Sequence, residues 1–202
     1  MKIRIKVKLI LALAILAVSA AGAVGYAQPA SAPVSKPHAE VALDYSYLHS
    51  NAPVGDCGCF NLNGGSATFA WLFGHRSFAL VGDVTVAHAD AISAGEYGLT
   101  LSTFTAGGRY APRLGHSALR PFGQALAGVA HSSGSLVEGQ NSVTSNAGAA
   151  FAANVGGGMD LRVSHHFSIR LVEADYLVTT FKNGVNDHQN NLRVSTGVVL
   201  HF

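Results

Sequence analysis

The sequence predicts an all-β protein, specifically an eight-stranded antiparallel up-and-down transmembrane β-barrel. Three observations predict this fold. After residue 38 the chain contains eight segments in which residues of opposite polarity alternate. The connections between these segments are alternately long and short, and the N-terminal segment is typical of exported proteins. With 202 residues the chain is long enough for one domain with a substantial interior.

The N-terminal segment has the order of a secretory signal peptide. Four basic residues within the first eight positions precede an unbroken apolar run at 9–18, and small residues follow. Cleavage after Ala27 is favoured, with cleavage after Ala23 as the alternative. An uncleaved anchor helix is the other interpretation, because the run could nearly span a bilayer. The predicted organisation is a signal peptide at 1–27, a linker with three prolines at 28–38, and a barrel at 39–202.

The charge of the chain argues against nucleic acid as a partner. Four of the 13 basic residues lie in the predicted signal peptide, which leaves 9 basic and 11 acidic residues in the mature chain. The mature chain contains no cluster of Lys and Arg that would bind a phosphate backbone. It also contains no second apolar run long enough for a membrane helix. This finding does not exclude a membrane barrel, because barrel strands alternate between apolar and polar residues.

The alternation of each segment divides its residues between two faces. In the first segment Leu43 and Tyr45 lie on one face, and Asp44 and Ser46 lie on the other. The fifth segment is rich in Ala and Gly, so its faces cannot be assigned. The eight predicted strands are 40–50, 65–73, 78–87, 98–110, 120–130, 149–163, 167–180 and 191–202.

The two faces and the connections indicate a membrane barrel rather than a soluble one. Aromatic residues such as Tyr45, Phe69 and Trp71 gather on the apolar faces, as in the girdles of membrane barrels. The opposite faces carry small and singly charged residues, which fit a narrow eight-strand lumen. If the N-terminus is periplasmic, all four longer connections lie outside, and an even strand number returns the C-terminus to the periplasm. We therefore expect both termini in the periplasm and the barrel in a bacterial outer membrane.

The last segment reads Ser195-Thr196-Gly197-Val198-Val199-Leu200-His201-Phe202. It resembles the assembly signal of bacterial outer-membrane barrels, in which Ser195, Gly197, Leu200 and Phe202 occupy the specified positions. Region 39–202 as a whole resembles the small barrels of the OmpA/OmpX type. The resemblance implies outer-membrane lipid and, during biogenesis, the barrel-assembly machinery as partners. We expect a monomer without a cofactor.

The same resemblance bears on the seventh segment, because barrels of this type often read apolar, Arg, apolar, Glu, aromatic there. Strict alternation would put Arg170 opposite Glu173 and Asp175, but one bulged residue near Leu171 and Val172 restores all three to the inner face. An Arg on the lipid face would cost about 2–4 kcal/mol near the midplane, which favours the inward assignment. We predict a structural charge network in the lumen, with a gated pore or proton path as the alternative. Its predicted members are Arg170, Glu173, Asp175, Asp160, Arg162 and Arg193, with Arg109 and Asp83 as further candidates.

The first long connection contains Cys57-Gly58-Cys59. In the oxidising envelope these residues could form a strained, labile disulfide. With His49 and Asp56 nearby, a site for a soft metal is a further alternative. The favoured interpretation is a pair of loop cysteines without a special role, because one Cys-x-Cys lacks the second pair of a metal motif.

The sequence predicts no catalytic, cofactor-binding or metal-binding residue. The ten histidines do not have metal-ligand spacing. His166-Phe167-Ser168 is similar to the His-x-Ser of outer-membrane lipid A deacylases, but the predicted topology places it at a periplasmic turn. The leading hypothesis is therefore a non-enzymatic barrel with an envelope-structural or surface-interaction role. A narrow channel or small-solute uptake barrel is the alternative, and a lipid A-modifying enzyme is the third.

Overall fold

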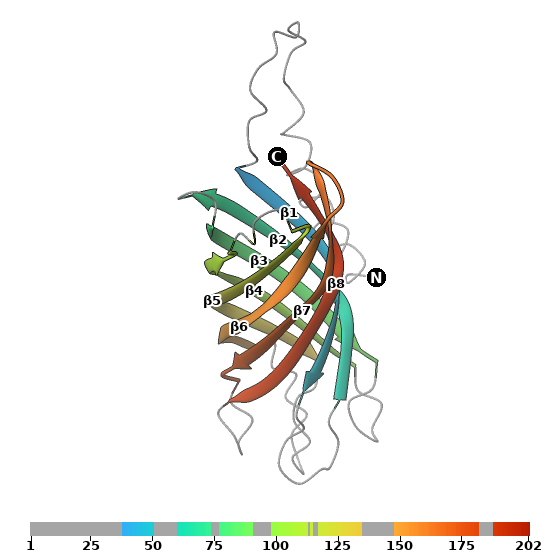
Figure 1. Cartoon of the computed structure of the whole chain (residues 1–202). Helices are drawn as coiled ribbons and strands as arrows, with labels where there is room; N and C mark the ends of the chain where they lie inside the picture. Colours follow the sequence, from blue (N-terminus) through green and yellow to red (C-terminus); the bar gives the residue numbers. More distant parts are fainter. Residues whose placement is uncertain are drawn as a thin grey trace, which may run out of the picture. The chain divides into compact units, whose positions relative to one another are not determined.

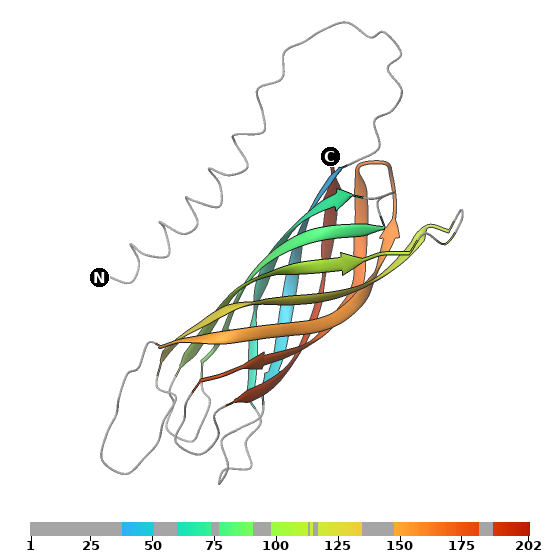
Figure 2. The same cartoon turned by 90° about the vertical axis from the view of Figure 1, so that its left-hand side faces the viewer.

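The computed structural model describes residues 38–50, 60–73, 77–90, 98–112, 114, 117–134, 148–181 and 188–202. Within these residues every strand pairs antiparallel with the next, and the last pairs with the first to close a barrel (Figures 1 and 2). The described part of the chain holds no helix of the length and apolar character that crossing a bilayer requires. The strands are β1 (Ala39–Ser50), β2 (Phe60–Phe73), β3 (Phe78–Ala89), β4 (Leu99–Tyr110), β5 (Leu119–Gly134), β6 (Gly148–Arg162), β7 (Phe167–Thr179) and β8 (Gln189–His201).

All eight predicted strands are present, which confirms the predicted fold class. The largest difference concerns β2, which begins at Phe60 rather than at Gly65. Outward-facing polar side chains extend the β1–β2 hairpin: Tyr45 donates a 2.6 Å hydrogen bond to Asn63 Oδ1, and His49 Nδ1 lies 2.7 Å from Asn61 Oδ1. Asn is depleted in strands in general, and these cross-strand partners help to explain why this segment pairs.

The two faces of the sheet have opposite chemistry. Asp44, Thr68 and Asp83 point inward and are buried, whereas Leu43 and Trp71 point outward and are each 54% exposed. A soluble barrel has an apolar interior and a polar exterior, and a membrane barrel reverses this arrangement. The predicted assignment of faces is therefore confirmed, and the exterior is suited to lipid.

Among the described strands, the alternation is interrupted by a bulge in β7. The pairing of β7 with β8 shifts between Arg170 and Glu173. Leu171 and Val172 both point outward, with exposed fractions of 45% and 44%. This bulge confirms the predicted one, and it turns Arg170, Glu173 and Asp175 to the same inner face.

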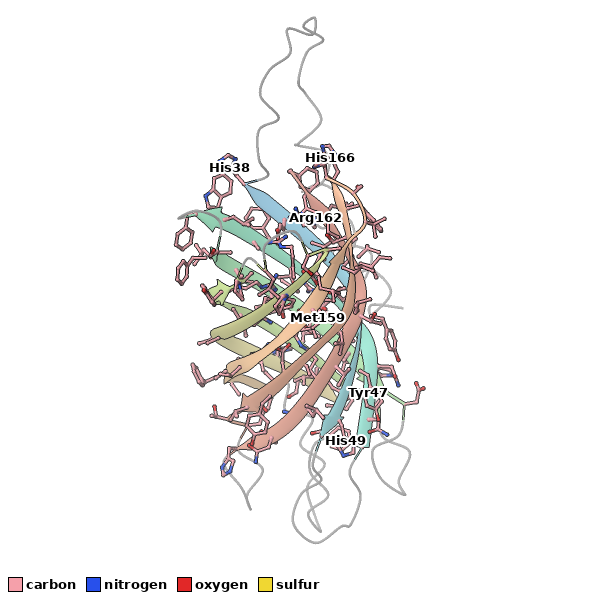
Figure 3. All side chains as sticks on the ribbon, in the orientation of Figure 1. His38, Tyr47, His49, Met159, Arg162 and His166 are labelled. Carbon is pink, nitrogen blue, oxygen red and sulfur yellow. The ribbon has the colours of Figure 1, made fainter. Side chains whose placement is uncertain are left out.

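The barrel has two different ends. We call the end with connections 74–77, 111–118 and 163–166 the short-turn end, and the end with connections 51–59, 90–98, 135–147 and 180–188 the long-loop end. Figure 3 shows His38, Arg162 and His166 at the short-turn end, and Tyr47 and His49 toward the long-loop end.

An apolar cluster fills the interior at the long-loop end. Leu48 and Leu62 are almost fully buried there, and Phe60 and Phe181 pack against the cluster. The other buried members come from β3 to β7, so the cluster receives side chains from seven strands. They are Ala87, Ala89, Leu99, Leu101, Ala130, Ala152 and Leu177.

Candidate functional site

A network of charged side chains occupies the interior, and Arg193 of β8 organises one half of it. Its Nη1 atom lies 2.8 Å from Asp83 Oδ1 of β3, across the interior. Its Nη2 atom lies 2.9 Å from Glu173 Oε1 and 2.6 Å from Asp175 Oδ2, both on β7. Alternation places Arg193 inward, and the β7 bulge places its two β7 partners inward. One guanidinium therefore ties three strands together through charge-assisted hydrogen bonds.

Arg170 of β7 organises the other half of the network. Its Nη1 atom lies 2.9 Å from Asp44 Oδ2 of β1 and 2.7 Å from Glu173 Oε2. Its Nε atom donates a 3.0 Å hydrogen bond to Asp160 Oδ1 of β6. Glu173 thus binds both arginines, one through each carboxylate oxygen, and joins the two halves.

Strand β5 adds neutral partners to the network. The Arg109 guanidinium donates hydrogen bonds of 3.1 and 2.8 Å to Gln124 Oε1, and Gln124 Nε2 donates a 3.1 Å bond to Glu173 Oε1. The ring of Phe122 lies 4.3 Å from the Cζ atom of Arg109 and 4.9 Å from that of Arg170. These distances allow favourable cation–π contacts with both guanidiniums.

The structure brings together five of the six predicted network residues, namely Arg170, Glu173, Asp175, Asp160 and Arg193. Both further candidates, Asp83 and Arg109, also lie in the network. The sixth predicted residue is a correction. Arg162 is exposed at the short-turn end, because β6 ends there and its last inward position lies beyond the closed interior.

Three members of the network were not predicted. Asp44 was assigned to the inner face, but its partner Arg170 is distant in sequence and no local pattern indicates the pair. Phe122 and Gln124 were missed because the Ala- and Gly-rich β5 hides its alternation. The pairing of Gln124 with Arg109 in the β4–β5 register is the signal that could have revealed the inner face.

Glycines make room for the charged side chains. A Cβ atom at Gly156 of β6 would overlap the Oδ1 atom of Asp175 and the backbone oxygen of Ala174. Gly156 belongs to a run of three consecutive glycines, and its missing side chain allows this close packing. The Asp175 carboxylate can therefore lie against the β6 backbone while it binds Arg193.

A second polar cluster lies at the short-turn end of the interior. His201 of β8 places Nδ1 3.1 Å from Glu40 Oε1 of β1 and Nε2 2.7 Å from Ser168 Oγ of β7. Arg120 Nη1 lies 2.9 Å from the same Glu40 oxygen. The alternation of β8 turns His201 inward, and its partners lie on other strands. These four residues lie at the short-turn end, near the first residues of β1, β5 and β7 and the last residue of β8.

The remaining candidates that the structure describes do not assemble into a site. His166 is exposed in a turn, whereas Ser168 is buried and bound to His201, so the His-x-Ser pattern does not form a catalytic pair. Among the described residues, no three His, Cys, Asp or Glu side chains are placed to hold a metal ion. Cys57, Cys59 and Asp56 lie outside the described residues.

Comparison with known proteins reveals similarity in structure. No protein-family model and no curated protein sequence matches the chain. Neisserial surface protein A is similar with a TM-score of 0.59 and 15% identity over 82% of this chain and 97% of that one. Ail, the attachment invasion locus protein of Yersinia pestis, is similar with a TM-score of 0.51 and 16% identity over 82% and 99%. OprG from Pseudomonas aeruginosa is similar with a TM-score of 0.51 and 12% identity over 83% and 97%.

These similarities extend over nearly the whole length of each solved structure. The chain therefore has the fold of the small eight-stranded outer-membrane β-barrels. Its apolar exterior and charged interior are those of an outer-membrane protein.

Removal of Arg193 is expected to destabilise the barrel strongly. Arg193→Met keeps an unbranched side chain but leaves Asp83, Glu173 and Asp175 without their common cation. Breaking a buried ion pair on one side costs about 3–5 kcal/mol. The free energy of unfolding in lipid vesicles should fall by about this amount. The control Arg162→Met removes an exposed arginine at the end of β6, where the loss of its contacts should cost no more than about 1 kcal/mol. Equal losses in both variants would contradict the importance of the network.

Proposed function

We propose that the protein is a non-enzymatic outer-membrane β-barrel that acts through its exterior rather than through a pore. In this proposal a signal peptide at 1–27 directs export, and the inserted monomer has both termini in the periplasm. The C-terminal residues Ser195, Gly197, Leu200 and Phe202 serve the barrel-assembly machinery. The long connections then face outward, where they contact other surfaces or molecules, while the barrel anchors them in the envelope.

The closed interior is the observation that carries this proposal. Arg170 and Arg193 bind five carboxylates across the middle of the barrel. The apolar cluster around Leu48 and Leu62 fills the long-loop end. An eight-stranded barrel is just wide enough for its side chains to fill the interior. A solute could pass only if the ion-pair network and the apolar cluster both moved apart. We therefore assign the role of the protein to its outer surface.

The names of two similar proteins support a surface role. One is called a surface protein, and the other is named for attachment and invasion. A structure of Ail also contains the heparin analogue sucrose octasulfate. In this chain the longest connection between strands, residues 135–147, is rich in Ser and Asn, which suits contact with polar partners.

The proposed orientation predicts which connections are accessible on intact cells. An epitope inserted within 135–147 should bind antibody on intact cells, because this connection would lie outside. The same epitope after the exposed Leu114, in the opposite connection, should bind only after the outer membrane is permeabilised. The reverse pattern would contradict the orientation, and labelling of neither site on intact cells would contradict surface display.

The closed interior also predicts that the protein conducts no ions across planar bilayers. Protein that is verified as folded by its unboiled gel mobility should give no discrete openings, because the ion pairs and the apolar cluster close the interior. The matched control is the same preparation after boiling, which reports openings from unfolded or contaminating material. Steady discrete openings that depend on the folded form would support the alternative, a narrow channel, and would contradict the proposed role.

A further inference from the structure

The pairing of β1 with β8 poses a problem that the other strand pairs do not have. Each other pair joins consecutive strands, whose connection limits how far they can slide. The β1–β8 pair joins strands from opposite ends of the barrel sequence, so its register must come from the side chains themselves. In the structure this register runs from Glu40 opposite His201 to Ser50 opposite Asn191.

We call the β1–β8 pairing the seam. The outward-facing side chains of the seam do not distinguish well between alternative registers. A slip by one residue would reverse every side chain and is excluded by the buried polar face. A slip by two residues keeps all faces and exchanges one apolar partner for another, for example Leu200 for Val198 opposite Val41. Lipid would accept both arrangements, so the register must depend on the inward face.

Gly197 is the first inward position that discriminates. It lies opposite Asp44, and a Cβ atom there would overlap Asp44 Oδ1 and the backbone oxygen of Leu43. The missing side chain lets the Asp44 carboxylate lie over β8 and reach Arg170 Nη1 at 2.9 Å. A slip by two residues would place Ser195 or Val199 opposite Asp44, and either side chain would occupy this space.

His201 is the second inward position that discriminates. Its two ring nitrogens bind Glu40 of β1 and Ser168 of β7, so one imidazole spans three neighbouring strands. A slip by two residues would place Glu40 opposite Val199 or His201 opposite Ala42. Either change leaves a buried polar group without its hydrogen bond, which is costly in a low-dielectric interior.

We propose that the inward face of β8 sets the register in which the barrel closes, with Gly197 admitting Asp44 and His201 binding Glu40. Ser168, His201 and Glu40 have the order of hydrogen bonds found in Ser–His–acid hydrolases. Ser168 is nevertheless 0% exposed, and Glu40 also binds Arg120. These three side chains therefore hold neighbouring strands together, and Ser168 does not act as a nucleophile.

Cysteine cross-links across the seam test this proposal. In a full-length chain with Cys57→Ser and Cys59→Ser, Tyr47→Cys is combined with Val194→Cys, its partner in the observed register. Parallel chains combine Tyr47→Cys with Leu192→Cys or Thr196→Cys, the partners after a slip by two residues. The folded, otherwise unaltered chain should cross-link 47 to 194 and neither of the slipped pairs.

Variants of the inward face should shift this pattern. Gly197→Ala together with His201→Ala should lower the ratio of observed to slipped cross-links at least about tenfold, which corresponds to about 1.4 kcal/mol. The matched control is Ser46→Ala, which removes a 2.9 Å bond to Ser195 on the same inward seam and should leave the ratio unchanged. An unchanged ratio in the double variant, or an equal fall in the control, would overturn the proposal.

An exchange of partners keeps the test decisive if the double variant fails to fold. Glu40→His together with His201→Glu restores a His–Glu pair across the seam and should recover part of the folding and of the 47–194 cross-link, because Arg120 still lacks its carboxylate partner. Failure of this exchange to exceed the His201→Glu single variant would overturn the proposal. Covalent labelling of Ser168 in the folded chain by a fluorophosphonate probe would also overturn it, because a buried structural serine should not react.

Discussion

The barrel depends on the neutralisation of buried charge by Arg170 and Arg193. Both guanidiniums are essentially inaccessible to solvent, and between them they bind carboxylates from β1, β3, β6 and β7. An uncompensated charge in such an interior is costly, so each partner must reach its position as the barrel closes. Contacts of this kind across the lumen complement the hydrogen bonds between neighbouring strands, which act only around the wall.

Several local features follow from this requirement. The β7 bulge places two outward residues in succession so that Arg170 and Glu173 share the interior. Gly156 and Gly197 lack side chains where the carboxylates of Asp175 and Asp44 lie against the neighbouring strand. The apolar cluster occupies the interior at the long-loop end of the barrel. The exterior is left apolar, as a lipid environment requires.

The sequence was sufficient for the strand count, the two faces, the bulge and most of the charge network. The strand count and the two faces follow from alternation. The bulge and the network follow from the resemblance to small outer-membrane barrels, together with the cost of charge on a lipid face. Asp44, Gln124 and Phe122 were missed as members of the network because their partners lie on other strands, and their contacts depend on barrel closure. Arg162 was misplaced because alternation gives the side of the sheet but not the point where the interior ends.

The apolar face of this sheet meets lipid while its charges lie inside. The first measurement is the gel mobility of the membrane-fractionated protein, with and without boiling in detergent. We expect a protein in the outer-membrane fraction whose mobility changes on boiling, because the closed barrel resists unfolding in detergent. A soluble periplasmic protein with the same mobility in both samples would mean that the apolar face lies inside instead.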